Sequence, residues 1–167
     1  MANKTESTSG TSDREIVLTR ILNAPRELVF KAWTDPRHII KWWGPDGFTN
    51  TIHEMNVKPG GVWRYIMHGP DGVDYPNKVV YSEVVKPERL VYVHGSDIEN
   101  DPAQFHVTVT FEEYNGQTKL TMRSIFPSAA ARDRVVNVYH AIEGGQQTLN
   151  HLEEHLRKMM NGDVAVE

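Results

Sequence analysis

The segment "FEEYNGQTKL" (111–120) constrains the fold of this chain more than any other. Asn115-Gly116 is a strong signal for a two-residue type I′ turn, because both central residues of that turn need a positive φ. A turn there pairs Phe111 with Leu120, Val109 with Met122, Val107 with Ser124 and Phe105 with Phe126. These side chains all fall on one face of the two strands, so the segment predicts an antiparallel hairpin with one buried face.

Other segments of the chain also have the composition and alternation of strands. We expect strands over residues 14–24, 49–56, 61–68, 74–86, 89–95, 103–114 and 117–126. Between the first two, residues 24–35 and 35–48 predict two short helices, with a proline near the start of the first and Gly44-Pro45 ending the second.

A stripe of residues near the C-terminus steps by three and four without a break, which is typical of one long amphipathic helix. Its members are Val135, Val138, Ile142, Gly145, Leu149, Leu152, Leu156 and Met159. Seven strands and one long helix cannot bury both faces of a sheet. We therefore expect an α+β fold, in which a curved antiparallel sheet surrounds this helix and the two short helices close one end.

The length of 167 residues fits a single domain with a substantial core. We expect this domain over residues 14–160, after a disordered polar tail at 1–13 and before a C-terminal tail at 161–167. The polar N-terminal segment lacks the apolar core of a secretory signal, and no run approaches the roughly 18 apolar residues of a membrane span. These features favour a cytoplasmic protein.

Charge and cysteine content exclude several function classes. The net charge is −4 and no basic block is present, so we expect no nucleic-acid partner. The chain has no cysteine, which excludes disulfide scaffolds, thiolate metal sites and thiol catalysis. No phosphate-binding glycine loop follows a strand, and no serine lies in a nucleophile motif, so we expect no cofactor.

The segment "HLEEH" (151–155) matches a spacing at which two histidines of one helix can share a zinc ion. The apolar stripe argues against such a site, because it directs His151 away from the core and leaves His155 on the flank of the helix. We therefore interpret both histidines as part of a solvated face and expect no metal.

Two glycines interrupt the predicted long helix. Each of Gly144 and Gly145 costs about 1 kcal/mol relative to alanine in a helix interior. One explanation is a close approach between the helix and a large side chain. The other is a notch that leaves space between helix and sheet. The two explanations are compatible.

The strands over residues 61–95 carry an unusual aromatic face. If "KPER" (86–89) forms a four-residue loop, Val85 pairs with Leu90, Glu83 with Tyr92 and Tyr81 with His94. The same face then extends to Trp63, Tyr65 and Met67. The opposite face is plainer, with valines at 80, 84, 91 and 93, and the sequence leaves open which face points inward.

An inward aromatic face that carries a carboxylate and an imidazole favours a ligand cavity over a packed core, because buried charge must be paired, protonated or hydrated. The expected ligand-binding residues are Trp63, Tyr65, Met67, Tyr81, Glu83, Tyr92, His94, Ile142 and Gly145. Trp42-Trp43 is expected to plug the end of the core, or else to form the lip of the cavity or a partner surface.

Several motifs together resemble a known family. They are "APRELVFKAWTDP", "WWGPDGF", "PGGVWRYIMHGPDG", "VVKPERLVY" and "EGGQQTLNHLEEHL", spread over residues 14–160. Their order is similar to the activator of Hsp90 ATPase homologue 1-like family of the START-like, Bet v 1-like (SRPBCC) superfamily. This resemblance implies the helix-grip fold and a deep cavity between sheet and helix. Relatives include polyketide cyclases, lipid carriers and self-resistance proteins, and no shared catalytic motif carries over.

Three functions follow as hypotheses. The first is binding of a hydrophobic or aromatic small molecule without catalysis. The second is a cyclase- or hydrolase-type enzyme that uses Glu83 with His94 or a tyrosine as acid and base. The third is an Hsp90-linked interaction module with an exposed apolar patch around Trp42 and Trp43. The chain has no room for the cochaperone's separate N-terminal domain, which argues against Hsp90 as a partner. A homodimer through an exposed strand or the Trp-rich loop stays open.

Overall fold

The computed structural model describes residues 11–167, so most of the predicted N-terminal tail (1–13) lies outside the described residues. The strands are β1 (Glu15–Leu22), β2 (Thr49–Met55), β3 (Val62–His68), β4 (Asp74–Val85), β5 (Arg89–Ser96), β6 (Phe105–Tyr114) and β7 (Gln117–Ile125). The helices are the short 3₁₀ helix η1 (Ser12–Arg14), α1 (Arg26–Thr34), α2 (Pro36–Trp42), α3 (Ala129–Asn137) and α4 (Ala141–Met160).

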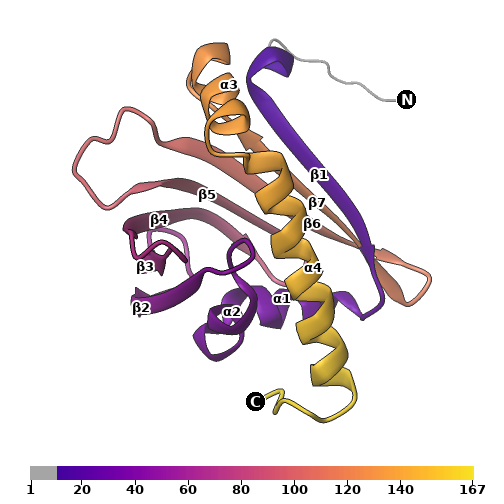
Figure 1. Cartoon of the computed structure of the whole chain (residues 1–167). Helices are drawn as coiled ribbons and strands as arrows, with labels where there is room; N and C mark the ends of the chain where they lie inside the picture. Colours follow the sequence, from indigo (N-terminus) through magenta and orange to yellow (C-terminus); the bar gives the residue numbers. More distant parts are fainter. Residues whose placement is uncertain (1–10) are drawn as a thin grey trace.

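The seven strands form one antiparallel sheet in the order β1-β7-β6-β5-β4-β3-β2. The sheet curves around α4, which crosses one of its faces, and α1 and α2 lie at one end of that face (Figure 1). The predicted α+β helix-grip architecture and the predicted order of strands and short helices are confirmed. No helix of residues 11–167 is long and apolar enough to cross a membrane.

The hairpin of β6 and β7 has the predicted register. Its pairs include Phe111 with Leu120, Val109 with Met122 and Val107 with Ser124. Asn115 and Gly116 have φ values of 52° and 81°, as the turn requires. Beyond the last paired residues, the rings of Phe105 and Phe126 stack with their centroids 4.7 Å apart.

The predicted long C-terminal helix is confirmed as α4, but it begins later than the apolar stripe predicts, because the stripe is divided between α3 and α4. His140 precedes α4 with a φ of 54°, in the left-handed region, and this conformation breaks the helix. Val138 lies in the break and is mostly exposed. The stripe is preserved in α4, which buries Leu149, Leu152, Leu156 and Met159 against the rest of the core.

Tryptophans fill the end of the core next to α1 and α2. Trp33 packs edge-to-face against Trp42 and Trp43, with ring centroids 5.0 and 5.9 Å away, and Trp43 continues to Trp63 at 5.3 Å. Trp42 and Trp43 are both buried. They plug the core as predicted, and the apolar patch that an interaction module would expose around them is not found there.

Candidate functional site

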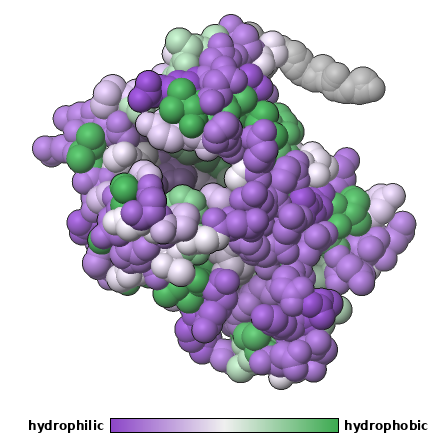
Figure 2. All heavy atoms as spheres, in the orientation of Figure 1, coloured by the Kyte–Doolittle hydropathy of each residue, from purple (hydrophilic) through white to green (hydrophobic). Residues whose placement is uncertain are grey.

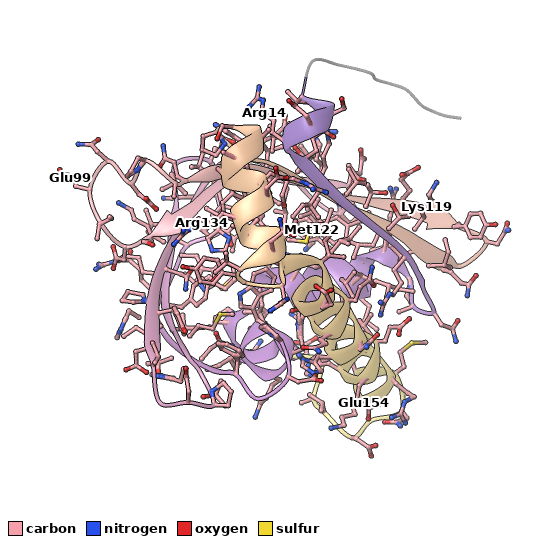
Figure 3. The ribbon with its side chains drawn as sticks, turned by 45° about the horizontal axis from the view of Figure 1, so that its top comes forward. Arg14, Glu99, Lys119, Met122, Arg134 and Glu154 are labelled. Atoms are coloured by element: carbon pink, nitrogen blue, oxygen red, sulfur yellow. The ribbon has the colours of Figure 1, made fainter. Side chains whose placement is uncertain are left out.

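A cavity of about 280 Å³ lies between the concave face of the sheet, the first half of α4 and the turn that precedes α4. β1 contributes Leu18, β3 contributes Tyr65 and Met67, β5 contributes His94, and α4 contributes Gly145 to its wall. Met122 of β7 projects into the space between the sheet and α4 (Figure 3). The surface is hollowed beside α4 on the face that Figure 2 shows.

The aromatic strand face points inward, which answers the question that the sequence leaves open. Trp63, Tyr65, Tyr81 and Tyr92 are at most 2% exposed, and all of them belong to the core. The valines at 80, 91 and 93 lie on the other face and stay partly exposed.

Glu83 does not share the inward orientation of these aromatic residues, so the prediction that it lines the cavity is wrong. A bulge between Tyr81 and Glu83 shifts the register, so that Tyr81 pairs with Tyr92 and Glu83 pairs with Val91. Glu83 therefore points outward and forms an ion pair with Arg89, whose guanidinium lowers the pKa of the carboxyl group.

Four predicted site residues line the cavity: Tyr65, Met67, His94 and Gly145. Trp63, Tyr81, Tyr92 and Ile142 do not line it. The first three are buried in the packed core next to the cavity, and Ile142 is only partly buried near the start of α4. Alternation along a strand indicates which side chains point inward, but it does not indicate where the packed core ends and the empty space begins.

The sequence analysis missed other residues of the wall. Phe105, Met122, Ser124 and Phe126 line the cavity, although only their shared hairpin face was predicted. The sequence could have indicated them, because the inner faces of neighbouring hairpins in one curved sheet border the same space. The inner face of the β6–β7 hairpin should therefore have been included in the predicted wall. Asn77 also lines the cavity, and its amide has no comparable sequence signal.

The two glycines of α4 serve both functions that the sequence suggests. A Cβ atom on Gly145 would lie 2.5 Å from Cδ1 of Leu18, so a side chain at this position requires the end of the Leu18 side chain to move. The close approach is therefore between α4 and Leu18 of β1. Gly144 has room for a Cβ at 3.4 Å from Pro45, and both glycines border the cavity.

Four polar side chains of the cavity wall form one hydrogen-bonded network. Trp43 Nε1 donates to the hydroxyl oxygen of Tyr65 at 3.0 Å. His94 Nε2 lies 3.2 Å from the same oxygen and 3.0 Å from Oδ1 of Asn77. The network therefore holds an imidazole and a phenol against the apolar wall, oriented by an indole and an amide.

The site is free of formal charge. No Asp, Glu, Lys or Arg belongs to the described residues that line the cavity. Burial lowers the pKa of His94 to about 4, so its imidazole is neutral at pH 7. Burial also raises the pKa of Tyr65, despite the opposing hydrogen bond from Trp43, so its hydroxyl keeps its proton. The arrangement can bind an uncharged, mostly apolar molecule and orient it by hydrogen bonds.

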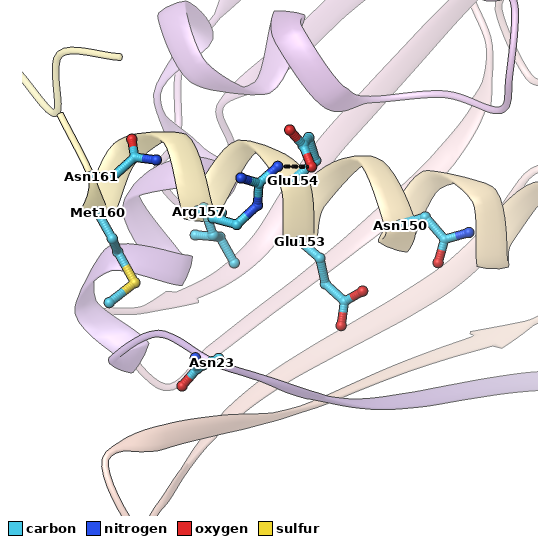
Figure 4. A pocket seen from close by; sticks show the side chains of 8 residues that line it. Asn23, Asn150, Glu153, Glu154, Arg157, Met160 and Asn161 are labelled. Carbon is cyan, nitrogen blue, oxygen red and sulfur yellow. Dashed lines mark ion pairs between the residues drawn. The ribbon is translucent and has the colours of Figure 1, made fainter. Parts of the chain in front are cut away.

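A second, wider hollow runs along the outside of α4 (Figure 4). Asn150, Glu153 and Asn161 line it, and Glu154 forms an ion pair with Arg157 at its edge. The side chains that line this groove are mostly polar and solvated, whereas the wall of the cavity beneath the helix is mostly apolar and carries a few hydrogen-bonding groups. We therefore place the candidate site in the inner cavity.

The two "HLEEH" histidines have different neighbours, and no cluster of three metal-ligating side chains occurs within residues 11–167. The expectation that both are solvated is wrong. His151 is partly buried and lies 2.7 Å from Asp46 Oδ1 and 2.9 Å from the Gly44 carbonyl oxygen. His155 is buried against His38. The loop between α2 and β2 folds over α4 and covers His151, a contact that helix periodicity alone cannot predict.

Comparison with known proteins agrees with this geometry. The chain is similar to a protein from Chromobacterium violaceum at 26% identity, with a TM-score of 0.75 over 86% of this chain and 96% of that one. A Mycobacterium smegmatis protein is also 26% identical, with a TM-score of 0.77 over 90% and 94%. A family namesake from Silicibacter pomeroyi has the same fold at 21% identity, with a TM-score of 0.71 over 86% and 97%. Comparison with curated proteins gave no significant match.

The family model described as "Activator of Hsp90 ATPase homolog 1-like protein" matches residues 23–157, which span α1 through most of α4. This segment includes almost the whole sheet and most of the cavity wall. The chain belongs to the activator of Hsp90 ATPase homolog 1-like family.

Proposed function

We propose that the protein binds a hydrophobic or aromatic small molecule in the cavity between the sheet and α4, without catalysis. The observation that carries this function is a half-open cavity of about 280 Å³ with a mostly apolar wall and a few hydrogen-bonding groups, and with no Asp, Glu, Lys or Arg among its described lining residues. That composition is typical of small-molecule sites, and the volume lies at the small end of their range.

Catalysis by Glu83 with His94 finds no support in the geometry. A general base in an enzyme is usually oriented by a carboxylate or a comparable charged group. The partner of His94 Nε2 is the amide oxygen of Asn77, and Glu83 lies on the outer face of the sheet. Burial also lowers the pKa of His94 to about 4, which makes it a weak base.

The hypothesis of an Hsp90-linked interaction module expects an exposed apolar patch around Trp42 and Trp43, and the geometry does not support that patch. Trp42 and Trp43 are buried, and their indole N–H groups donate to Ala32 and Tyr65 inside the protein. A homodimer and a cytoplasmic location stay predictions, to be checked by light scattering of the purified protein and by cell fractionation.

A cavity-filling substitution tests the proposal. Ser124 lines the cavity from β7, whereas Thr121 of the same strand faces the opposite side. Ser124→Leu should abolish binding of small aromatic compounds, as measured by equilibrium dialysis or native mass spectrometry, because its side chain enters the ligand space. The matched control Thr121→Leu adds comparable bulk outside the cavity and should bind normally. Equal binding by both variants, or no binding of any compound by the unmodified chain, contradicts the proposal.

A further inference from the structure

Asn77 determines the tautomer of His94. Asn77 Nδ2 donates to the carbonyl oxygen of Tyr75 at 2.8 Å, which directs Oδ1 of the amide toward His94 Nε2 at 3.0 Å. An amide oxygen can only accept a hydrogen bond. His94 Nε2 therefore carries the hydrogen and donates it to Asn77.

This tautomer leaves the hydroxyl hydrogen of Tyr65 without an acceptor. The hydroxyl oxygen of Tyr65 accepts from Trp43 Nε1, and the nearby His94 Nε2 already bears a hydrogen and cannot accept another. No other acceptor for this hydrogen occurs within the described part of the chain. Tyr65 is 1% exposed and lines the cavity, so the free hydrogen is buried next to the ligand space.

A second buried donor belongs to the same wall. Trp33 lines the cavity, and its buried indole Nε1 lies near the Tyr92 hydroxyl but forms no well-aligned hydrogen bond among residues 11–167. Buried donors without acceptors cost free energy, and they are rare unless a ligand or water satisfies them. The cavity thus has donors in excess and lacks acceptors for them.

The wall offers no counterion to a charged ligand. No lysine or arginine is among the described residues that border the cavity. A carboxylate or phosphate that entered would lose its hydration without gaining a partner of opposite charge, which is strongly unfavourable.

We infer that the ligand is an uncharged molecule of one or two rings whose carbonyl or ether oxygen accepts the hydroxyl hydrogen of Tyr65, and that its carboxylate analogues are excluded. This inference rests on the proposed function and names the chemical class of its ligand. The size follows from the cavity, whose volume of about 280 Å³ corresponds to about nine waters of liquid.

Three probes of one shape test it: 2-ethylnaphthalene, 2-acetylnaphthalene and 2-naphthoate, measured with the full chain by equilibrium dialysis at pH 7. The ketone should bind roughly five- to tenfold more tightly than the hydrocarbon, because it gains one hydrogen bond. The carboxylate should bind more weakly than the hydrocarbon, because its charge is desolvated without a partner.

Tyr65→Phe should remove the advantage of the ketone over 2-ethylnaphthalene, and a cooperative urea transition of the variant checks that it is folded. The matched control is Tyr81→Phe, since the Tyr81 hydroxyl is buried without a partner and does not line the cavity. This control should keep the full preference for the ketone.

Binding of naphthoate as tight as that of the ketone, or an undiminished preference for the ketone in Tyr65→Phe, overturns this inference and leaves the proposed function in place. Failure of all three probes to bind overturns the proposed function and this inference together.

Discussion

His155 Nε2 of α4 lies 2.9 Å from His38 Nδ1 of α2, and both imidazoles are buried. His38 Nε2 lies 2.7 Å from the carbonyl oxygen of Val166, so it must donate to that oxygen. His38 Nδ1 and His155 Nε2 share a second hydrogen bond. This chain of hydrogen bonds connects α2, α4 and the C-terminal segment.

The first prediction concerns acid stability. Burial, with smaller contributions from His38, Lys158 and Lys41, lowers the pKa of His155 from 6.5 to about 4, and burial alone lowers that of His94 to about 4. The unfolded chain therefore binds more protons than the folded protein between about pH 6.5 and pH 4. The free energy of unfolding should have its maximum value above this window and should fall as the pH drops through it. The expected loss is about 2 kcal/mol per histidine, after allowance for partial hydration.

Urea denaturation at pH 7 and at pH 4.5 measures this loss. His155→Gln removes one titrating group and keeps a side-chain donor for His38, so its stability should depend less steeply on pH. The control His53→Gln changes an exposed histidine and should keep the pH dependence of the unmodified protein. If the stability of His155→Gln depends on pH as that of the unmodified protein does, the pKa of His155 is not lowered by folding.

The adjacent glycines of α4 should respond in opposite ways to the same substitution. Gly144→Ala should raise the free energy of unfolding by about 0.5–1 kcal/mol, because alanine favours the helix and its Cβ has room beside Pro45. Gly145→Ala should gain nothing or destabilise the protein, because its Cβ meets Leu18 at 2.5 Å. Adding Leu18→Ala should relieve that clash, so a double-mutant cycle by thermal unfolding should give a favourable coupling energy. Additive effects would contradict the close approach.

Much of the fold could be predicted because independent local signals agree. In the hairpin of β6 and β7, turn chemistry at Asn115-Gly116 and alternation in both strands specify the same register. The hairpin of β4 and β5 has alternation without an equally specific turn, and the bulge after Tyr81 has no recognisable sequence signature. His140 likewise adopts a left-handed conformation that periodicity does not predict. The apolar stripe is therefore divided between two helices, α3 and α4.

The candidate site was less predictable than the fold, because a cavity depends on what several elements leave unfilled. Tyr65 and Tyr81 both point inward from neighbouring strands, yet only Tyr65 reaches the cavity. The difference depends on how far α4 stands from each strand. The role of Asn77 depends on its hydrogen bonds to Tyr75 and His94, and only coordinates reveal these contacts.

These two tyrosines should also differ in their contributions to stability. Tyr65→Phe leaves Trp43 Nε1 without an acceptor, so we expect a loss of about 1 kcal/mol in the free energy of unfolding. Tyr81→Phe removes a buried hydroxyl that has no partner within the described residues, so it should be neutral or slightly stabilising. Urea denaturation of both variants measures the difference. A larger loss in Tyr81→Phe would indicate that a buried water satisfies its hydroxyl.

The last prediction separates the cavity from the outer face of the sheet. Glu83 pairs with Arg89 in solvent, while His94 borders the cavity 3.0 Å from Asn77, so the two residues lie on opposite faces. Glu83→Gln should leave the affinity for 2-acetylnaphthalene unchanged in equilibrium dialysis, because it removes only an exposed ion pair. Asn77→Leu should weaken that affinity, since without the Asn77 acceptor His94 can adopt the Nδ1–H tautomer, whose Nε2 accepts the Tyr65 hydroxyl hydrogen in place of the ketone. If Glu83→Gln loses affinity to the same extent as Asn77→Leu, Glu83 does not lie on the outer face of the sheet.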